Sequence, residues 1–268
     1  MKIVYAIYEP ERRKYGIVRK KVDYLKLLKA SILSIRHFSN EHEIILITHQ
    51  SGASKKLLNL ADKMNIKVIY VEDEFIEFCK KLYNNWNKQD CWDLTIGAYF
   101  RFYAFFNYDE FLYLDPDTII FSDLSKLNNF RGKKVYIRYD PASLPEVKIN
   151  SGVILQRKKW INKEEILNHI DTNSGKTHSK LDQGLIQDIL NRKIIEDKSL
   201  LGYLPPEFNF REKFYFGGTI VRDKIENGIK IPVGKDKENN EEEIEILHHT
   251  ISNNNQFKKN IYCQQFLK

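Results

Sequence analysis

The chain has 268 residues, of which 42% are hydrophobic, so it is long enough to build one large α/β domain with a sizeable core. Its 12 glycines and 7 prolines argue against a disordered chain, and its net charge of +7 comes from scattered basic residues that favour a solvated surface over a nucleic-acid-binding face. The 3 cysteines include no Cys-x-x-Cys pair, which is typical of a reducing compartment and predicts no zinc site.

No stretch of the sequence is long and apolar enough to form a transmembrane helix or a signal peptide. We therefore expect a cytoplasmic protein without a transmembrane segment and without a nucleic-acid partner. The sequence leaves open peripheral contact with a membrane, and it does not indicate an oligomeric state.

The first half of the chain alternates between short apolar runs, which predict strands, and apolar residues at helical spacing. Strands are expected at residues 2–8, 44–48, 67–71 and 110–114. Helices are expected at residues 22–35, 54–64, 73–82 and 94–106, with Ser54 and Asp73 as N-caps. This alternation predicts a Rossmann-like, mixed and mostly parallel sheet with helices on both faces.

The second half is less regular. Strands are expected at residues 135–139, 152–156 and 245–248, helices at 158–170 and 181–191, a strand plus loop at 200–210, and a charged loop at 235–243. No internal repeat and no linker divides the chain. A single mixed α/β domain is the simplest prediction.

Two carboxylates, Asp115 and Asp117, follow the apolar run 111–114 and are separated by Pro116. Pro116 favours an extended conformation at Asp115, and residues i and i+2 of an extended chain point to the same side. Ligands bind at the carboxyl ends of strands in sheets of this kind. The pair therefore predicts a site for a hard divalent cation, which often brings a diphosphate with it. The alternative is a solvated turn.

Other candidate residues have two interpretations each. Asn150 opens a turn expected before a strand, and its amide suits sugar hydroxyls or merely the turn itself. Asp182 and Gln183 present a carboxylate and an amide at a pocket rim, or Asp182 simply occupies the first turn of a helix. Arg101 pairs with a diphosphate or forms a surface salt bridge. His248 is a third ligand for a Mn²⁺-type ion or is structural.

These features occur in one order along the chain: Arg101, Tyr113 to Thr118 with its Asp-x-Asp motif, Asn150 to Leu155, Asp182-Gln183, and Leu247-His248. That order resembles the family 8 glycosyltransferases, which include glycogenin and bacterial lipopolysaccharide galactosyl- and glucosyltransferases. The resemblance spans residues 1–250 and leaves 251–268 as a polar C-terminal segment. It implies a GT-A fold and a metal-dependent hexosyltransferase that retains the anomeric configuration. It also implies Mn²⁺ or Mg²⁺ as the cofactor, a UDP-sugar as the donor, and a glycan, glycolipid or protein hydroxyl as the acceptor.

The resemblance also implies roles for individual residues. The metal ion would be bound by Asp115, Asp117 and His248. The donor would be contacted by Arg101 at its sugar or phosphates, by Asp115 near its ribose, and at its nucleobase by Ala6, Ile7 and Tyr8. The catalytic set would be Asn150 and Asp182 on sugar hydroxyls and Gln183 near the anomeric carbon. Because Gln183 is a poor nucleophile and Asp182 is only a candidate, the sequence favours same-face attack over a covalent intermediate.

The chain departs from the family pattern after His248. The family shows a glycine and then a Lys-Pro-Trp stretch whose lysine touches the diphosphate, whereas residues 249–253 contain neither. Lys258 and Lys259 are the nearby lysines that could replace it. The departure keeps open a non-catalytic GT-A protein that binds a nucleotide sugar or a glycan. A sugar nucleotidyltransferase is disfavoured, because residues 9–21 hold a single glycine, Gly16.

Overall fold

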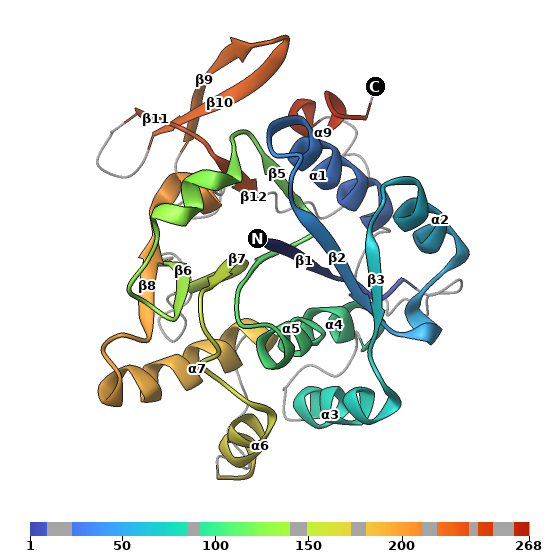
Figure 1. Cartoon of the computed structure of the whole chain (residues 1–268), viewed down its shortest axis with the longest axis vertical. Coiled ribbons are helices and arrows are strands. Elements are labelled where there is room, and N and C mark those ends of the chain that lie inside the picture. Colours follow the sequence, from blue (N-terminus) through green and yellow to red (C-terminus); the bar gives the residue numbers. More distant parts are fainter. Residues whose placement is uncertain are drawn as a thin grey trace.

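The computed structural model describes residues 1–9, 23–84, 92–139, 149–172, 181–210, 219–235, 241–248 and 260–267, without the side chains of residues 92–95 and 181. Its central sheet has seven strands in the order β3-β2-β1-β4-β7-β6-β8 (Figure 1). They are β1 (Lys2–Ala6), β2 (Glu43–Thr48), β3 (Lys67–Tyr70), β4 (Phe111–Leu114), β6 (Val135–Tyr139), β7 (Ile149–Gln156) and β8 (Leu201–Leu204). Only β7 runs against its neighbours in this sheet, so the predicted mixed and mostly parallel sheet is confirmed.

Helices cover both faces of the sheet, as the alternating pattern predicted (Figure 1). They are α1 (Tyr24–Phe38), α2 (Lys55–Lys63), α3 (Asp73–Asn84), α4 (Trp92–Tyr99), α5 (Arg101–Asn107), α6 (Lys163–Thr172), α7 (Leu181–Glu196) and the short α9 (Ile261–Gln264). Val4 and Ala6 of β1 belong to the core beneath α3 to α7, whereas Ile3, Tyr5 and Ile7 belong to the core beneath α1 and α2. This split follows from the two-residue side-chain period of a strand.

Two smaller sheets flank the central one. β5 (Thr118–Ile120) pairs antiparallel with β12 (Ile246–His248), and β9 (Thr219–Glu226), β10 (Ile229–Lys235) and β11 (Glu241–Glu243) form an antiparallel sheet that projects from the body (Figure 1). Tyr262 and Cys263 of α9 are buried against this part of the molecule. Residues 260–267 are therefore packed, while the division of the chain at residue 250 stays a prediction.

The structure differs from the sequence-based expectations at several elements. The helix expected at 94–106 is two helices, α4 and α5, which meet at Phe100. Asp73 does not cap a helix, because it is the first helical residue of α3 and its carboxylate contacts His49 Nε2 at 3.0 Å. Ser54 does cap α2, since its side chain accepts from Leu57 N. The expectations missed β9 and β10, and residues 241–243 of the expected charged loop form β11.

The strand expected at 152–156 begins earlier, at Ile149, so Asn150, Ser151 and Gly152 lie within β7 rather than in a turn before it. Ile137 of β6 pairs with Ile154, and the next residue of β6, Arg138, pairs with Asn150. The residues between these two partners form a bulge in β7. A bulge redirects side chains locally, and Asn150 is the residue at which the pairing with β6 resumes.

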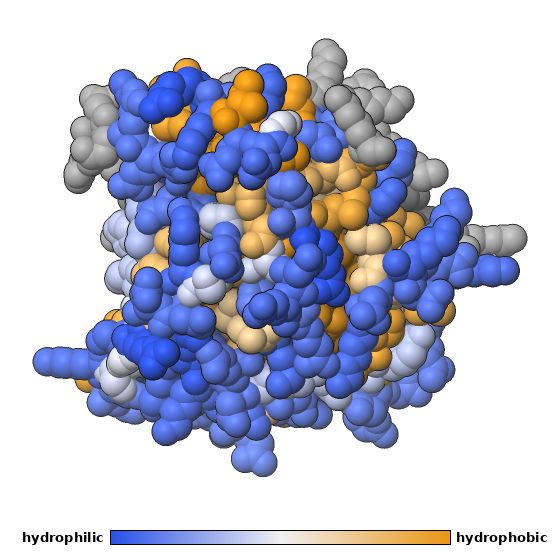
Figure 2. All heavy atoms as spheres, turned by 45° about the horizontal axis from the view of Figure 1, so that its top comes forward, coloured by the Kyte–Doolittle hydropathy of each residue, from blue (hydrophilic) through white to orange (hydrophobic). Residues whose placement is uncertain are grey.

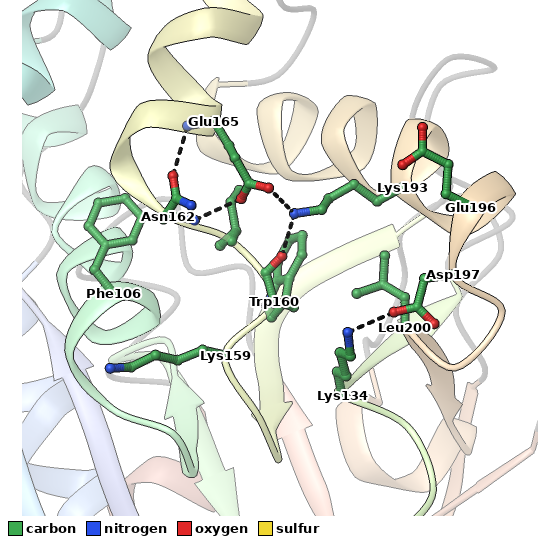
Figure 3. A pocket seen from close by; sticks show the side chains of 11 residues that line it. Phe106, Lys134, Lys159, Trp160, Asn162, Glu165, Lys193, Glu196, Asp197 and Leu200 are labelled. Atoms are coloured by element: carbon green, nitrogen blue, oxygen red, sulfur yellow. Dashed lines mark hydrogen bonds and ion pairs between the residues drawn. The ribbon is translucent and has the colours of Figure 1, made fainter.

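At its other end, β7 leads to a cavity of about 400 Å³, which is lined by residues of α5, α6 and α7 and by the segment between β7 and α6, including Trp160 (Figure 3). Helix α6 begins at Lys163 rather than at residue 158, because Asn162 and Glu165 bond reciprocally through their side chains and backbone amides. Lys193 of α7 reaches Glu165 and the Trp160 carbonyl, both at 2.6 Å. These bonds tie α6 and α7 to the end of the sheet.

Hydrophilic residues form most of the face drawn in Figure 2, and hydrophobic ones show in smaller areas among them. Within the described residues, no helix combines the length and the apolar character that crossing a membrane requires.

Candidate metal site at the carboxyl edge of the sheet

Two strand pairings bring the candidate metal ligands together. Asp115 follows β4, and its N–H donates to Gly152 O at 2.8 Å, which extends the pairing of β4 with β7. Thr118 N and Oγ1 both donate to Asp115 O, at 3.1 and 2.8 Å, and so close the turn through Pro116 and Asp117. The pairing of β5 with β12 then places His248 opposite Thr118. His248 therefore lies beside two carboxylates that precede it by about half the length of the chain.

The three side chains converge on one point. His248 Nε2 lies 3.7 Å from Asp115 Oδ2 and 3.4 Å from Asp117 Oδ1, and one ligand atom of each residue lies within 4.8 Å of the others. Two ligands about 2.1 Å from one ion are roughly 3 Å apart when adjacent in an octahedron and about 4.2 Å apart when opposite. The two distances from His248 Nε2 fall between these limits. Two carboxylates with an imidazole suit an ion such as Mn²⁺. Asp115, Asp117 and His248 therefore form a group that could hold a metal ion, and their role as its ligands stays a prediction.

Two buried amides contact the Nδ1 atom of His248, whereas its Nε2 atom faces the carboxylates. Its Nδ1 lies 3.1 Å from the Oδ1 atoms of both Asn150 and Asn209. Its ring lies directly over Gly152, where a Cβ atom would stand 2.1 Å from His248 Cε1. Position 152 therefore has to be glycine if the imidazole is to reach the carboxylates. Sequence reasoning missed Asn209, because a single polar residue between Phe208 and Phe210 carries no signal of its own.

Arg101 joins the metal ligands to α7. Its guanidinium donates from Nη2 to Asp115 Oδ1 at 3.0 Å, from Nη1 to Ser151 O at 2.7 Å, and from Nε to Ala98 O at 3.0 Å. Its side chain is only 4% exposed, so the salt bridge considered from the sequence is present but buried rather than at the surface. Nε also lies 3.0 Å from Asp182 Oδ2, an atom for which the described residues provide no hydrogen-bond partner. Because the Nε–H is directed at Ala98 O, this contact is an ion pair without an aligned hydrogen bond.

Burial shapes the protonation of the groups around Asp115. The pKa of Asp182 is raised to about 6, because burial disfavours its charged form more than the Arg101 guanidinium favours it. The pKa of Arg101 is raised, since burial lowers it but Asp182, Tyr113 and Asp115 together outweigh that effect. The pKa of Tyr113 is raised well above its usual value, mainly by burial. Arg101 is thus a fixed cation, and Tyr113 is a neutral donor whose hydroxyl bonds Asp115 Oδ1 at 2.9 Å.

The other proposed catalytic residues lie close by. Gln183 Oε1 is 3.4 Å from both N and Oγ of Ser151, which faces Arg101 through its carbonyl. Asn150 is 3% exposed, and its Oδ1 accepts from Gly152 N at 3.0 Å and from Asn209 Nδ2 at 2.8 Å. Its carbonyl end is therefore engaged within the protein, and among the described residues no hydrogen bond uses its Nδ2 end.

The predicted nucleobase residues lie at the end of β1, on the same edge of the sheet as Asp115. Ala6 and Ile7 are each only 5% exposed and belong to the cores on opposite faces of the sheet. Tyr8 is half-buried, with its hydroxyl 3.1 Å from Ser51 Oγ. Of these three side chains, the ring of Tyr8 is the one partly open to a ligand. Lys258 and Lys259 lie outside the described residues.

Comparisons with known proteins bear on the fold. No protein-family model and no curated protein matches the sequence, but solved structures match the fold. The galactosyltransferase LgtC, in complex with donor and acceptor sugar analogs, matches with a TM-score of 0.59 at 15% identity, over 94% of this chain and 87% of that one. An active-site mutant of LgtC matches with a TM-score of 0.64 at 14% identity, over 100% and 94%.

Mouse xyloside xylosyltransferase 1 in its apo form gives a TM-score of 0.56 at 11% identity, over 93% of this chain and 97% of that one. Identities this low establish the fold alone. The chain therefore has the GT-A fold that its resemblance to the family 8 glycosyltransferases predicts.

Proposed function

We propose that the protein is a metal-dependent glycosyltransferase that moves a hexose from a nucleoside diphosphate sugar, most simply a UDP-hexose, to an acceptor hydroxyl with retention. The observation that carries this proposal is the convergence of Asp115, Asp117 and His248 at the carboxyl edge of the sheet. Folds of this kind bind ligands at that edge. The GT-A fold, shared with a galactosyltransferase and a xylosyltransferase, supports the same reading.

The cation would be Mn²⁺ or Mg²⁺, which as a Lewis acid stabilises the negative charge that develops on a departing diphosphate. Arg101 adds fixed positive charge beside the same position. A guanidinium has five N–H donors, and three of those on Arg101 are already used within the protein. Arg101 therefore orients Asp115 and keeps donors for a phosphate or a sugar hydroxyl.

The sugar-binding side of the proposed site would be formed by Asn150, Asp182 and Gln183. Asn150 offers its Nδ2 donor, because its Oδ1 is bonded within the protein. Asp182 offers an oxygen without a hydrogen-bond partner, which suits a sugar hydroxyl. Gln183 is an amide, and Asp182 is in contact with Arg101, so neither is an activated nucleophile. Retention is therefore proposed to follow from same-face attack by the acceptor hydroxyl of a glycan, glycolipid or protein.

The proposal is tested with a thermal-shift panel of UDP- and GDP-sugars with and without Mn²⁺, followed by an assay of nucleotide release from the stabilising donor. Ligand at 100 times its Kd stabilises the folded state by about 2.7 kcal/mol, which raises the melting temperature by several degrees. We expect a Mn²⁺-dependent shift with a UDP-hexose and slow release of UDP without an acceptor.

Asp117→Ala should abolish release of UDP. Asp109 is an exposed carboxylate at the opposite end of β4, so Asp109→Ala is the control and should still release UDP. Parental turnover by Asp117→Ala would overturn the proposal. Metal-dependent binding without release would instead identify a non-catalytic nucleotide-sugar-binding protein.

A further inference from the structure

Asn209 lies between the candidate metal ligand and the bulge of β7, and neither the sequence patterns nor the family resemblance assigns it a role. It is the last residue of the 3-10 helix η4 (Pro206–Asn209), and it is fully buried. Its amide touches both Asn150 and His248. A buried side chain that can both donate and accept fixes the orientation of two neighbours at once.

The backbone N–H of Gly152 determines the direction of the hydrogen bonds that link Asn150, Asn209 and His248. Gly152 N–H can only donate, so the Asn150 atom 3.0 Å from it is the acceptor Oδ1. The Asn209 atom 2.8 Å from that same oxygen must then be a donor, Nδ2. The other end of the Asn209 amide is therefore its oxygen, which lies 3.1 Å from His248 Nδ1.

Both atoms that face His248 Nδ1 are thus acceptors, Oδ1 of Asn150 and Oδ1 of Asn209, each at 3.1 Å. A neutral imidazole carries its proton on one nitrogen and a lone pair on the other. The proton therefore belongs on Nδ1, and the lone pair on Nε2 faces Asp115 and Asp117. A lone pair opposite two carboxylates is repulsive until a cation lies between them.

We propose that Asn209 is a positioning residue that fixes His248 as a metal ligand, by holding its proton on Nδ1 and its Nε2 lone pair toward Asp115 and Asp117. This inference rests on the metal-binding part of the proposed function. It assigns to Asn209 the outer-shell role that a carboxylate or carbonyl plays behind many metal-bound histidines.

The backbone around Asn209 is locked to the strand that carries His248. Phe210 N donates to Ile246 O at 2.9 Å, and His248 N donates to Phe210 O at 2.8 Å. The Arg138 guanidinium bonds the carbonyls of Pro206 and Asn209 from the other side. Asn209 and His248 therefore move as one unit, and a substitution at position 209 acts on the imidazole rather than on a loose loop.

The first test measures Mn²⁺ affinity by calorimetry or by electron paramagnetic resonance, with no nucleotide sugar present. Loss of an outer-shell partner typically weakens metal binding by about 10–100-fold. We expect that loss for Asn209→Leu, which keeps the volume but removes both hydrogen bonds. Asn209→Asp keeps an acceptor for the Nδ1 proton but loses the donor to Asn150, so its Mn²⁺ affinity should lie between those of the parent and Asn209→Leu.

Gln156→Leu is the matched control, because Gln156 is also a fully buried amide on β7 but bonds the carbonyls of Tyr108 and Asp109 at the far end of the strand. It should reduce stability without changing Mn²⁺ affinity. Parental affinity in Asn209→Leu, or an equal loss in Gln156→Leu, would overturn the proposal.

The second test needs no variant at position 209. The ¹⁵N chemical shifts of the 7 histidines, recorded without metal at an alkaline pH, report which ring nitrogen carries the proton, and His248→Gln assigns the signal. A proton on Nδ1 of His248 supports the proposal, and a proton on Nε2 overturns it. Neither test involves glycosyl transfer. A protein that passes both tests and transfers no sugar would contradict the proposed function alone.

Discussion

Replacing Gly152 with alanine is the most direct way to test the geometry of the metal site. A Cβ at this position would lie 2.1 Å from Cε1, 2.3 Å from Nδ1 and 2.9 Å from Nε2 of His248. All three atoms belong to a rigid ring that is 8% exposed and held by two amides. No flexible end of a side chain can yield, so the ring or the strand must move.

The size of the movement follows from the same distances. Ordinary van der Waals contact begins at 3.4 Å, so the ring must retreat by about 1.3 Å. Metal–ligand distances hold to within about 0.2 Å, so an imidazole displaced that far no longer coordinates. We expect Gly152→Ala to weaken Mn²⁺ binding by at least the roughly 100-fold that marks the upper end for loss of an outer-shell partner. The overpacking should also lower the free energy of unfolding by about 1–3 kcal/mol.

Mn²⁺ titration and denaturant unfolding measure the two effects separately. Gly202→Ala on β8 is the matched control, because a Cβ there would lie 2.4 Å from the Tyr136 ring, in the same sheet but away from the metal ligands. Gly202→Ala should lower the free energy of unfolding about as much as Gly152→Ala does, and it should leave Mn²⁺ affinity unchanged. The reasoning is refuted if Gly152→Ala binds Mn²⁺ like the parent protein, or if both variants lose affinity equally.

Two further predictions concern the buried charges beside Asp115. Arg101→Lys keeps the charge but cannot reproduce the hydrogen bonds to Ser151 and Asp115. In metal-free buffer the free energy of unfolding should therefore fall by about 2–4 kcal/mol. Arg131→Lys, on the surface, is the control and should change the free energy of unfolding by less than about 0.5 kcal/mol. Similar denaturant curves for the two variants would contradict the role given to Arg101. The pKa of Asp182 is about 6 in the folded protein, above the value near 3.9 of an unfolded chain, so its contribution to stability is present below about pH 4 and is lost as the pH rises through about 6. Asp182→Asn removes this dependence of stability on pH. As the pH rises from about 4 to 7.5, the free energy of unfolding of Asp182→Asn should increase relative to that of the parent by up to about 3 kcal/mol. An equal pH dependence of unfolding in both proteins would show that the pKa of Asp182 is not raised.

The sequence predicts the part of the fold that depends on local pattern. The apolar runs of β1, β2, β3 and β4 are short and alternate with segments of helical periodicity, so both the parallel sheet and the position of Asp115 and Asp117 at its edge could be predicted. His248 could be placed near them only through the family resemblance, because its approach depends on the pairing of β5 with β12. That pairing is a long-range contact without a local signal.

The features that escaped prediction arise from tertiary packing. The bulge of β7 exists because β6 pairs with Ile154 and Asn150 in succession, and no property of Asn150, Ser151 and Gly152 themselves distinguishes it from a turn. The break between α4 and α5 at Phe100 lies inside a continuous apolar pattern. β9 and β10 were missed because the residues of β9 are almost all exposed and charged residues interrupt its apolar ones.

The pairing of β12 with β5 has a consequence for the order in which the molecule opens. An ion held jointly by Asp115, Asp117 and His248 would act as a removable cross-link between the end of β4 and β12. These two segments are more than a hundred residues apart in the sequence. Closing so long a segment restricts the unfolded chain, in the manner of a disulfide. Chelation would thus loosen the end of the polypeptide first, and β12 would exchange its amide hydrogens before β1 or β4.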